Sequence, residues 1–457
     1  MASTYLTNTF GTPTNQNIWT FSCWIKRSND NVAETIFAPD IPNGSIYNQM
    51  LLRADGTLQW YGTDDAGGNS MNLTTNRVFG DINAWYHLVF AWDSTQGTAS
   101  NRAKLYVNGV QETSFSTATY PVQNSTAVYT WNEASRLHSL GARRYTGSPT
   151  GYFSGSMSHV HFCDGTAYQA STFGETDSTT GEWKIKTGPT VTYGNNGFFL
   201  KMEDRTNLDL DSSGNAHTFT TVGNLTATYD NPSNNFCTMN PLDNYYLGGT
   251  FTNGNNTVGT SGGKEWATGT MGVSAGLWYY ESETGQETAF DYNYIGIAHG
   301  PATSSNMSLG KRANDYALSS YNGKIYTNNA GNTYGDSWSG TGVILGVYID
   351  LNANKLYFAK DGVIMNSGTG FDITAAASTT NSFYTPAVAD DHSQYNTDWL
   401  CNFGNGYFGT TAVTSAVADA GGIGAFEYDP SDGGASSFDG VAKDFRAICT
   451  KNINTYG

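Results

Sequence analysis

Two carboxylates on one predicted strand are the feature of this sequence that points most directly to catalysis. Glu281 and Glu283 lie in the run YYESETGQE, and side chains two residues apart on a strand project from the same face. Such a pair can supply the acid and the nucleophile of a retaining glycoside hydrolase. The alternative is an ordinary strand with two glutamates, and Glu287 lies too far along to add a third acidic position. We favour the alternative and expect a protein that is not an enzyme.

A calcium ion is the cofactor that the acidic loops suggest. Hard cations bind clusters of carboxylate and carbonyl oxygens on loops. The run GTDDAGGNS supplies Asp64 and Asp65, and the run VADDHSQYNTD supplies Asp390 and Asp391. Neither run has the fixed ligand spacing of an EF-hand, so acidic loops that bind only water remain the alternative. The sequence suggests no other cofactor.

Aromatic side chains in predicted loops suggest a saccharide-binding surface. A ring can stack on the apolar face of a sugar while neighbouring Asn, Asp or Gln side chains hydrogen-bond its hydroxyls. Most rings in a chain this aromatic must instead lie in a core or at a subunit interface. The candidates for the exposed role are Trp131, Tyr145, Tyr395 and Trp399.

Histidine and cysteine positions give little support for a zinc site or a nucleophilic triad. His87, His159 and His161 lie in predicted strands, where we interpret them as structural, and no third ligand has a suggestive spacing. No GxSxG elbow is present. The five cysteines have no CxxC pair, so we expect buried free thiols at Cys23, Cys163, Cys237, Cys401 and Cys449.

The elements that would position these residues become visible in a phrase that occurs twice. In the first copy, AKLYVNGV, Leu105 and Val107 point to one face of a predicted strand. The Asn108-Gly109 pair that follows favours a two-residue hairpin, because both residues tolerate positive φ. The run WYHLVFAWD before it is apolar on both faces, which is typical of a strand in the middle of a sandwich.

The second copy, NKLYFAKDGV, follows the run GVILGVYID in the same way. Leu356 and Phe358 share a face, and Asp361-Gly362 supplies the turn. This copy is two residues longer between leucine and glycine, and an insertion of two preserves the buried face. We predict one supersecondary unit that is used once in each of two β-sandwich domains.

Composition agrees with an all-β protein and excludes several partners. The chain has 457 residues with 14% aromatic and only 13% charged residues, and its 53 glycines suit short strands joined by turns. The net charge of −17 disfavours nucleic acid and anionic membranes, and no apolar run reaches the roughly 20 residues that span a bilayer. The first residues lack the pattern of a secretion signal, so we expect synthesis in a cytoplasm.

Two ordered sets of motifs resemble known families. WYHLVFAWD, AKLYVNG and FSGSMSHVHF, within residues 15–165, resemble the laminin-G-like and pentraxin-like branch of the concanavalin-like sandwiches, whose members often bind calcium at the rim. GLWYYESE, YIGIA, GVILGVYIDLNANKLYFAKDGV, YTPAV and CNFG, within residues 260–405, resemble a SPRY domain. The resemblance implies two concanavalin-like jelly-roll β-sandwiches in tandem. We therefore expect a sandwich over 1–172, a bridging segment packed across both sandwiches over 173–235, and a SPRY-like sandwich over 236–457.

The stretches MASTYLTNTFGT, FGETDSTTGEWKIKTG, GNNGFFLKMED and NPSNNFCTMNPLD resemble virion proteins of tailed phages, many of them marine. This resemblance implies a structural role in the virion, as a capsid decoration or a fibre, in contact with other virion proteins. It also implies a homo-oligomer such as a trimer and contact with host surface glycans. Arg143 and Arg144 then have an alternative use, as partners for an acidic neighbouring subunit.

The sequence is compatible with three other functions. The chain can be a carbohydrate-binding lectin that is not part of a particle. It can be a glycan-cleaving enzyme built on the concanavalin fold. It can also be an intracellular adaptor, since SPRY-like domains commonly bind peptides through their loops.

Overall fold

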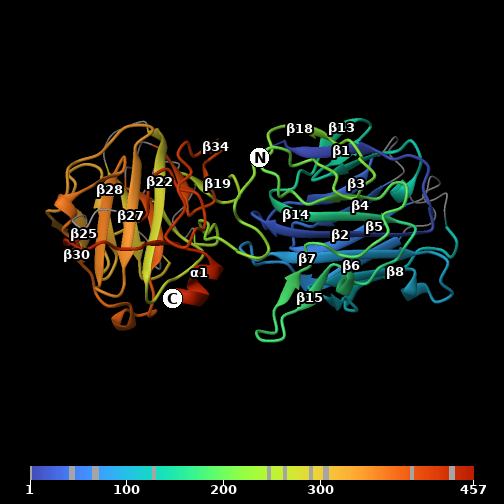
Figure 1. Cartoon of the computed structure of the whole chain (residues 1–457), viewed down its shortest axis with the longest axis horizontal. Helices are drawn as coiled ribbons and strands as arrows, with labels where there is room; N and C mark the ends of the chain where they lie inside the picture. The colour runs from blue at the N-terminus through green and yellow to red at the C-terminus, as the bar shows by residue number, and fades with distance from the viewer. Residues whose placement is uncertain are drawn as a thin grey trace. The chain divides into compact units, whose positions relative to one another are not determined.

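The computed structural model of the chain describes residues 3–40, 47–63, 71–125, 130–243, 249–260, 265–287, 292–301, 308–391, 396–431 and 438–457, except for the side chains of residues 286 and 287. The chain divides into two units, Met1–Ala227 and Thr228–Gly457 (Figure 1), and each is described by itself. Both units are built from strands, as the composition predicts. Within these ranges the only α-helix is α1 (Thr450–Tyr456), and no helix is long and apolar enough to span a bilayer.

The first unit is a sandwich of two antiparallel sheets around one apolar core, in which the rings of Trp19, Trp60 and Trp92 lie together. The eight-stranded sheet has the order β10 (Phe115–Thr119), β6 (Met71–Val78), β5 (Thr57–Gly62), β4 (Asn48–Leu52), β3 (Glu34–Pro39), β11 (Leu137–Leu140), β1 (Tyr5–Thr9), β18 (Thr220–Val222). The six-stranded sheet has the order β17 (Phe198–Leu200), β14 (Gly155–Asp164), β2 (Ile18–Arg27), β7 (Tyr86–Asp93), β8 (Ala103–Val107), β9 (Val110–Gln111). Two further hairpins are β12 (Arg143–Tyr145) with β13 (Ser148–Thr150), and β15 (Gly174–Thr176) with β16 (Trp183–Ile185).

The second unit is also a sandwich of two sheets, with Trp278 and Trp338 buried in its core. Its larger sheet has the order β19 (Thr250–Thr252), β20 (Thr257–Gly259), β32 (Thr397–Asn402), β22 (Leu277–Glu287), β27 (Ile344–Asp350), β28 (Lys355–Lys360), β29 (Val363–Ile364), with β30 (Phe371–Asp372) beside β28 and β35 (Arg446–Ala447) beside β22. Its smaller sheet has the order β21 (Glu265–Thr268), β31 (Thr385–Asp390), β23 (Asn293–Ala298), β24 (Tyr316–Ser319), β25 (Ile325–Thr327), β26 (Ala330–Asn332). A separate hairpin joins β33 (Tyr407–Phe408) to β34 (Thr411–Ala412).

The repeated phrase forms the same hairpin in both units, which confirms the prediction. The turn between β8 and β9 has φ 46° at Asn108 and 82° at Gly109. The turn between β28 and β29 has φ 47° at Asp361 and 77° at Gly362. Positive φ at both central residues is the signature of a type I′ turn. The predicted inward-facing side chains are all buried in the two cores: Leu105, Val107, Leu356 and Phe358.

A later segment of the first unit covers the outer face of its hairpin. Tyr106 of β8 points away from the core and packs with Phe173 and Trp183 in a second apolar cluster. A Cβ atom on Gly109 would lie 2.4 Å from the Trp183 ring, and Trp183 Nε1 donates a hydrogen bond of 3.0 Å to His87 Nδ1. The β15–β16 hairpin therefore closes the outer side of this sheet.

The second unit covers its hairpin with residues near the C-terminus. Tyr357 of β28 points away from the core and packs with Phe438 and Phe445. A Cβ atom on Gly362 would lie 2.5 Å from the Tyr428 ring. Both units thus place an aromatic ring directly against the glycine of the turn.

The expectation of a bridge over residues 173–235 is corrected. Residues up to 227 belong to the first unit, where β17 pairs with β14 and β18 pairs with β1. Residues from 228 belong to the second unit, where the Asn235 backbone N–H donates to Thr450 Oγ1 at 3.0 Å. The strands of this segment are three residues long, too short for a period of two to be recognised in the sequence.

The contact between Gly109 and Trp183 predicts a large effect of one methyl group. Gly109→Ala should destabilise the first unit by about 2–4 kcal/mol, because alanine is disfavoured at positive φ and its Cβ would overlap the ring. Gly181→Ala is the matched control, because Gly181 has φ 76° and no atom within 4 Å of its Cβ position. Calorimetric scans of both variants measure the difference. Equal melting temperatures would show that the Trp183 contact contributes nothing.

Candidate functional site

A row of uncharged polar side chains crosses the outer face of the eight-stranded sheet. Alternate side chains of β5 enter the core, so Gln59 and Tyr61 face outward. Tyr61 lies directly opposite Gln49 of β4 on one side and Asn72 of β6 on the other. These four residues, Gln49, Gln59, Tyr61 and Asn72, are called the polar row below.

Hydrogen bonds within the polar row orient its amides. Gln59 Nε2 donates to Asn72 Oδ1 at 3.1 Å, and Thr74 Oγ1 donates to the same oxygen at 2.8 Å. Because its oxygen accepts both bonds, the Asn72 amide nitrogen is left as a donor. Within the described part of the chain, no hydrogen bond engages the Asn72 amide nitrogen or the Tyr61 hydroxyl. The row therefore presents polar groups that are orientated before any ligand arrives.

The β12–β13 hairpin lies against one end of the polar row. Arg143 Nη1 donates to Gln49 Oε1 at 3.1 Å. Tyr145, two residues after Arg143, stacks on Tyr47, two residues before Gln49, with ring centroids 6.1 Å apart and an interplanar angle of 19°. Tyr145 is 36% exposed. The end of the row thus combines a cation, an amide and an exposed tyrosine.

Two of the four aromatic candidates are corrected by burial. Trp131 and Trp399 have no exposed surface, because each lies in the core of its unit. Neither can offer a ring face to a sugar. Tyr145 is exposed and lies beside the polar row, whereas Tyr395 is outside the described residues.

Asp390 and Asp391 do not form a calcium site with the other residues that the structure describes. Asp390 is buried and accepts a hydrogen bond from Thr260 Oγ1 at 2.9 Å. Asp391 faces Lys311, with 3.9 Å between Oδ2 and Nζ. No cluster of three His, Cys, Asp or Glu side chains suited to a metal occurs among these residues. Asp64 and Asp65 lie outside the described residues.

The Glu281 carboxylate is enclosed rather than open to a substrate. It has no exposed surface. Its Oε1 accepts hydrogen bonds from Asn402 Nδ2 at 2.8 Å and from the Glu427 backbone at 2.7 Å, and its Oε2 accepts one from the Tyr279 hydroxyl at 3.0 Å. Burial raises the pKa of Glu281 to about 7. Glu283 is half-buried, so the two carboxylates lie in different environments and do not form an open catalytic pair.

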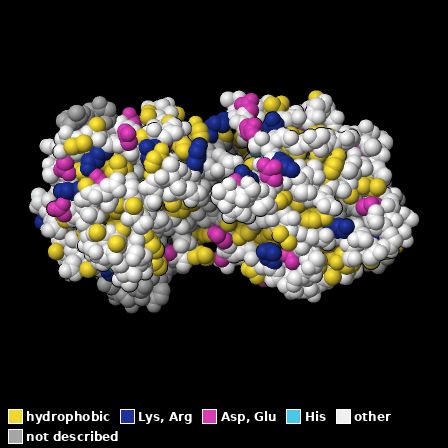
Figure 2. Space-filling model, turned by 60° about the horizontal axis from the view of Figure 1, so that its bottom comes forward, with side chains coloured by type: hydrophobic (Ala, Val, Ile, Leu, Met, Phe, Trp, Pro, Cys, Tyr) yellow, Lys and Arg dark blue, Asp and Glu magenta, His cyan; other side chains and the backbone are white. Residues whose placement is uncertain are grey.

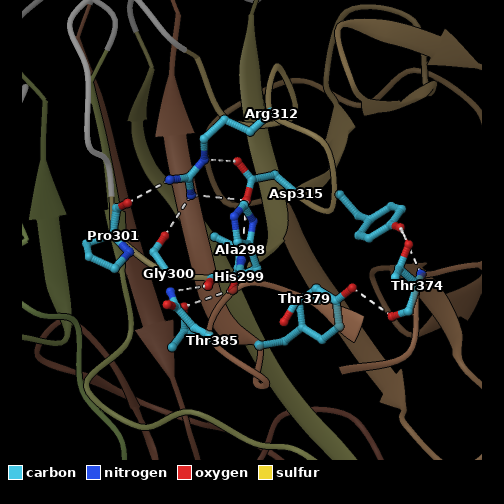
Figure 3. Close-up of polar contacts among 12 residues, drawn as sticks. Ala298, His299, Gly300, Pro301, Arg312, Asp315, Thr374, Thr379 and Thr385 are labelled. Atoms are coloured by element: carbon cyan, nitrogen blue, oxygen red, sulfur yellow. Dashed lines mark hydrogen bonds and ion pairs between the residues drawn. The ribbon is translucent and has the colours of Figure 1, made fainter. Parts of the chain in front are cut away.

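A His–Asp–Arg cluster fastens the loop after β23 (Figure 3). His299 Nδ1 lies 3.0 Å from Asp315 Oδ1. Arg312 donates to both oxygens of Asp315, at 2.7 and 3.1 Å, and to the carbonyls of Gly300 and Pro301, at 2.7 Å each. All three guanidinium nitrogens are engaged. The described residues bring no hydroxyl or thiol into hydrogen-bond contact with His299, so the pair lacks the nucleophile of a triad.

His87, His159 and His161 are buried, which agrees with a structural role. His87 lies between Ser22 Oγ, 2.9 Å from its Nε2, and Trp183 Nε1, 3.0 Å from its Nδ1. Burial lowers the pKa of His87 to about 3, so the ring is neutral. His161 stacks on Phe199. All five cysteines are buried and none forms a disulfide, as expected.

The polar row was missed in the sequence. Its only local signal is the alternation in TLQWYG, where Gln59 and Tyr61 alternate with core residues. The neighbours Gln49 and Asn72 come from other strands, and their alignment with Tyr61 depends on the register of three strands. Register is fixed by tertiary packing and cannot be read from one strand.

Comparison with known families identifies both domains. Residues 2–172 match the concanavalin A-like lectin/glucanases superfamily, and residues 277–389 match the SPRY domain. The chain therefore contains a concanavalin A-like β-sandwich, which carries the polar row, and a SPRY β-sandwich, which carries Glu281. No curated protein matches the chain.

Solved structures of both kinds are similar to parts of the chain. The SPRY domain of human HERC1 is 18% identical to this chain, and the match covers 36% of this chain and 96% of the HERC1 domain, with a TM-score of 0.29. A human SPRY domain is 20% identical over 32% of this chain and 90% of its own, with a TM-score of 0.23. The heptameric SAP-like pentraxin from Limulus polyphemus is 16% identical over 42% of this chain and 89% of its own, with a TM-score of 0.29. The assignment of the two domains rests on the family matches.

The buried Glu281 predicts a pH dependence of the second unit. Its folded pKa of about 7 lies above the ordinary value of 4.5, so the folded state binds the proton more tightly than the unfolded state does. This stabilisation is complete below pH 4.5 and is lost as the pH rises through about 7, by about 3 kcal/mol. Glu281→Gln should remove this slope, as calorimetric scans between pH 4.5 and 8 would measure.

Glu283→Gln is the control for this experiment, because it removes a half-buried carboxylate from the same strand. The control should keep most of the slope. A Glu281→Gln protein with the slope of the unsubstituted protein would contradict the assignment.

Proposed function

We propose that this protein, which joins a concanavalin A-like domain to a SPRY domain, binds saccharides on the polar row and does not cleave them. The observation that carries the proposal is the chemistry of that face. The strands β4, β5 and β6, which supply the row, contain no Asp or Glu. Glycoside hydrolases of the usual kinds need two carboxylates beside the scissile bond. Amides and a tyrosine can hold a sugar but supply no acid and nucleophile.

Saccharide recognition fits the groups that the row presents. A sugar hydroxyl both donates and accepts, so it pairs well with an amide that does the same. The Tyr61 ring and the Tyr47–Tyr145 stack offer apolar faces beside these amides. Charged side chains of both signs are scattered over the face of the molecule shown in Figure 2, in keeping with a chain of which only 13% of the residues are charged.

The SPRY domain supports a second activity, the binding of another protein. Tyr292 and Tyr321 are 40% and 55% exposed, and their rings stack with centroids 5.6 Å apart at 18°. Exposed tyrosines are frequent anchors of protein interfaces. This pair is a candidate contact for a protein partner. Glu281 on the larger sheet is not, because it is buried under the segment that contains Glu427.

We further propose that the protein is a virion component of a tailed phage, made in the host cytoplasm, and that it assembles as a homo-oligomer with other virion proteins. Support comes from the motifs of the N-terminal and central segments, which resemble such proteins, and from a low content of charged residues. Binding of host surface glycans by the first domain and of virion proteins by the second would suit this role.

The saccharide proposal predicts binding by the whole chain on a glycan array. Tyr61→Ala and Asn72→Ala should each weaken the strongest interaction about tenfold, because each removes a ring contact or a donor at the row. Tyr321→Ala is the control, since it removes an exposed tyrosine from the other domain. Calorimetric titration measures the affinity of each variant and of the unsubstituted protein for the same saccharide. Loss of binding in the control alone would place the site on the SPRY domain.

The virion proposal predicts that mass spectrometry of purified phage particles detects this chain at a stoichiometry of many copies. Presence of the chain only in the soluble fraction of infected cells would instead favour a lectin or adaptor without an assembly role.

A further inference from the structure

We infer, resting on the proposed function, that the saccharide held by the polar row carries a carboxylate and that Arg143 binds this group. The ligand class is that of acidic saccharides, such as uronic acids. The site lies at the end of the row, where Arg143 of the β12–β13 hairpin contacts Gln49 of β4.

Arg143 has only neutral partners. Its Nη1 donates to Gln49 Oε1 at 3.1 Å, and its Nε donates to Thr150 Oγ1 at 3.4 Å. Within the described ranges no carboxylate lies within 4.0 Å of it. A guanidinium carries five donors, so most of the donors of Arg143 are not used by these two bonds. The side chain is half-buried, which removes part of its hydration without supplying a counter-charge.

The neighbouring arginine shows the contrast. Arg144 Nε lies 3.6 Å from Asp40 Oδ1, and Arg144 Nη2 donates to the Gly147 carbonyl at 3.0 Å. Arg144 is therefore neutralised within the chain and serves the hairpin itself. The two adjacent arginines have the same chemistry, but only Arg143 is both bonded to the polar row and left without an acidic partner among the described residues.

The position of Arg143 is set in advance. The bond to Gln49 fixes one edge of the guanidinium against the row, and the bond to Thr150 ties its other edge to the hairpin. The remaining donors match the two oxygens of a carboxylate, which arginine binds in a fork. The exposed Tyr145 ring lies two residues along the same strand, where it can pack on the sugar that bears the carboxylate.

The overall charge of the chain does not oppose this assignment. The net charge is −17, but exposed charges are screened over about 8 Å at physiological ionic strength. Among the described residues, the charged side chains shown at this end of the row are Arg143 and the paired Arg144 and Asp40. An acidic side chain of a neighbouring subunit is the competing partner for Arg143. Light scattering on the Arg143→Gln variant distinguishes this partner from a saccharide.

The experiment uses the full chain and a panel of oligosaccharides of galacturonate, glucuronate and mannuronate, each as the free acid and as its methyl ester. The ester keeps the sugar ring, removes the negative charge and adds one methyl group. The unsubstituted protein should bind one free acid about tenfold more tightly than its ester, which is the effect of a charged hydrogen bond. Arg143→Gln should abolish this preference while the binding of the ester remains. Arg143→Lys should keep part of it, because the charge stays and the fork is lost.

Arg144→Gln is the matched control and should leave the preference for the free acid in place, because Arg144 is already paired with Asp40. Equal binding of acid and ester by the unsubstituted protein, or binding of neutral glycans alone, would overturn the inference and leave the proposed function standing. A preference that survives in Arg143→Gln would overturn it as well. Failure to bind any saccharide would overturn the proposed function itself. A change in oligomer mass for Arg143→Gln, measured by light scattering, with unchanged saccharide binding would assign Arg143 to a subunit interface.

Discussion

Each sandwich depends on covering the outer face of the sheet that contains its hairpin, because that face is nearly as apolar as the face toward the core. In the first unit Val89, Ala91 and Tyr106 lie on that outer face, and Phe173 and Trp183 cover them. Leaving these side chains in water would cost about 25 cal/mol for each Å² of apolar surface. The covering segments are therefore part of each domain, although the sequence places them far from the strands that they protect.

This covering decides where each domain can bind. In the SPRY domain the backbone N–H of Glu427, which belongs to the covering segment, donates to Glu281, so the same packing that shields the sheet also closes the carboxylate. In the concanavalin A-like domain the outer side of the six-stranded sheet is covered, whereas Gln59, Tyr61 and Asn72 of the eight-stranded sheet are partly exposed among the described residues. The strands β4, β5 and β6, which carry these residues, contain amides and no carboxylates. The enclosure of Glu281 in the SPRY domain and the amides of the polar row in the other domain are the features from which saccharide binding is proposed.

The fold was largely predictable because its strongest signals are local. Alternation around Leu105 and Leu356, followed by Asn-Gly and Asp-Gly, fixes the strand faces and the turns within a few residues. The site was not predictable to the same extent. Trp131 has a loop-like sequence neighbourhood and yet fills the core, and the polar row exists only through pairing between strands. The segment over 173–227 escaped recognition because its strands are short and its contacts are long-range.

The side-chain amides of Gln49, Gln59 and Asn72 can report directly on whether the polar row is the surface that meets a saccharide. Their NH₂ resonances, assigned by NMR and followed during titration with a saccharide that the protein binds, should shift together and saturate with one dissociation constant. Shifts confined to the neighbourhood of Tyr292 and Tyr321, with the three amides unmoved at saturation, would contradict saccharide binding on the polar row.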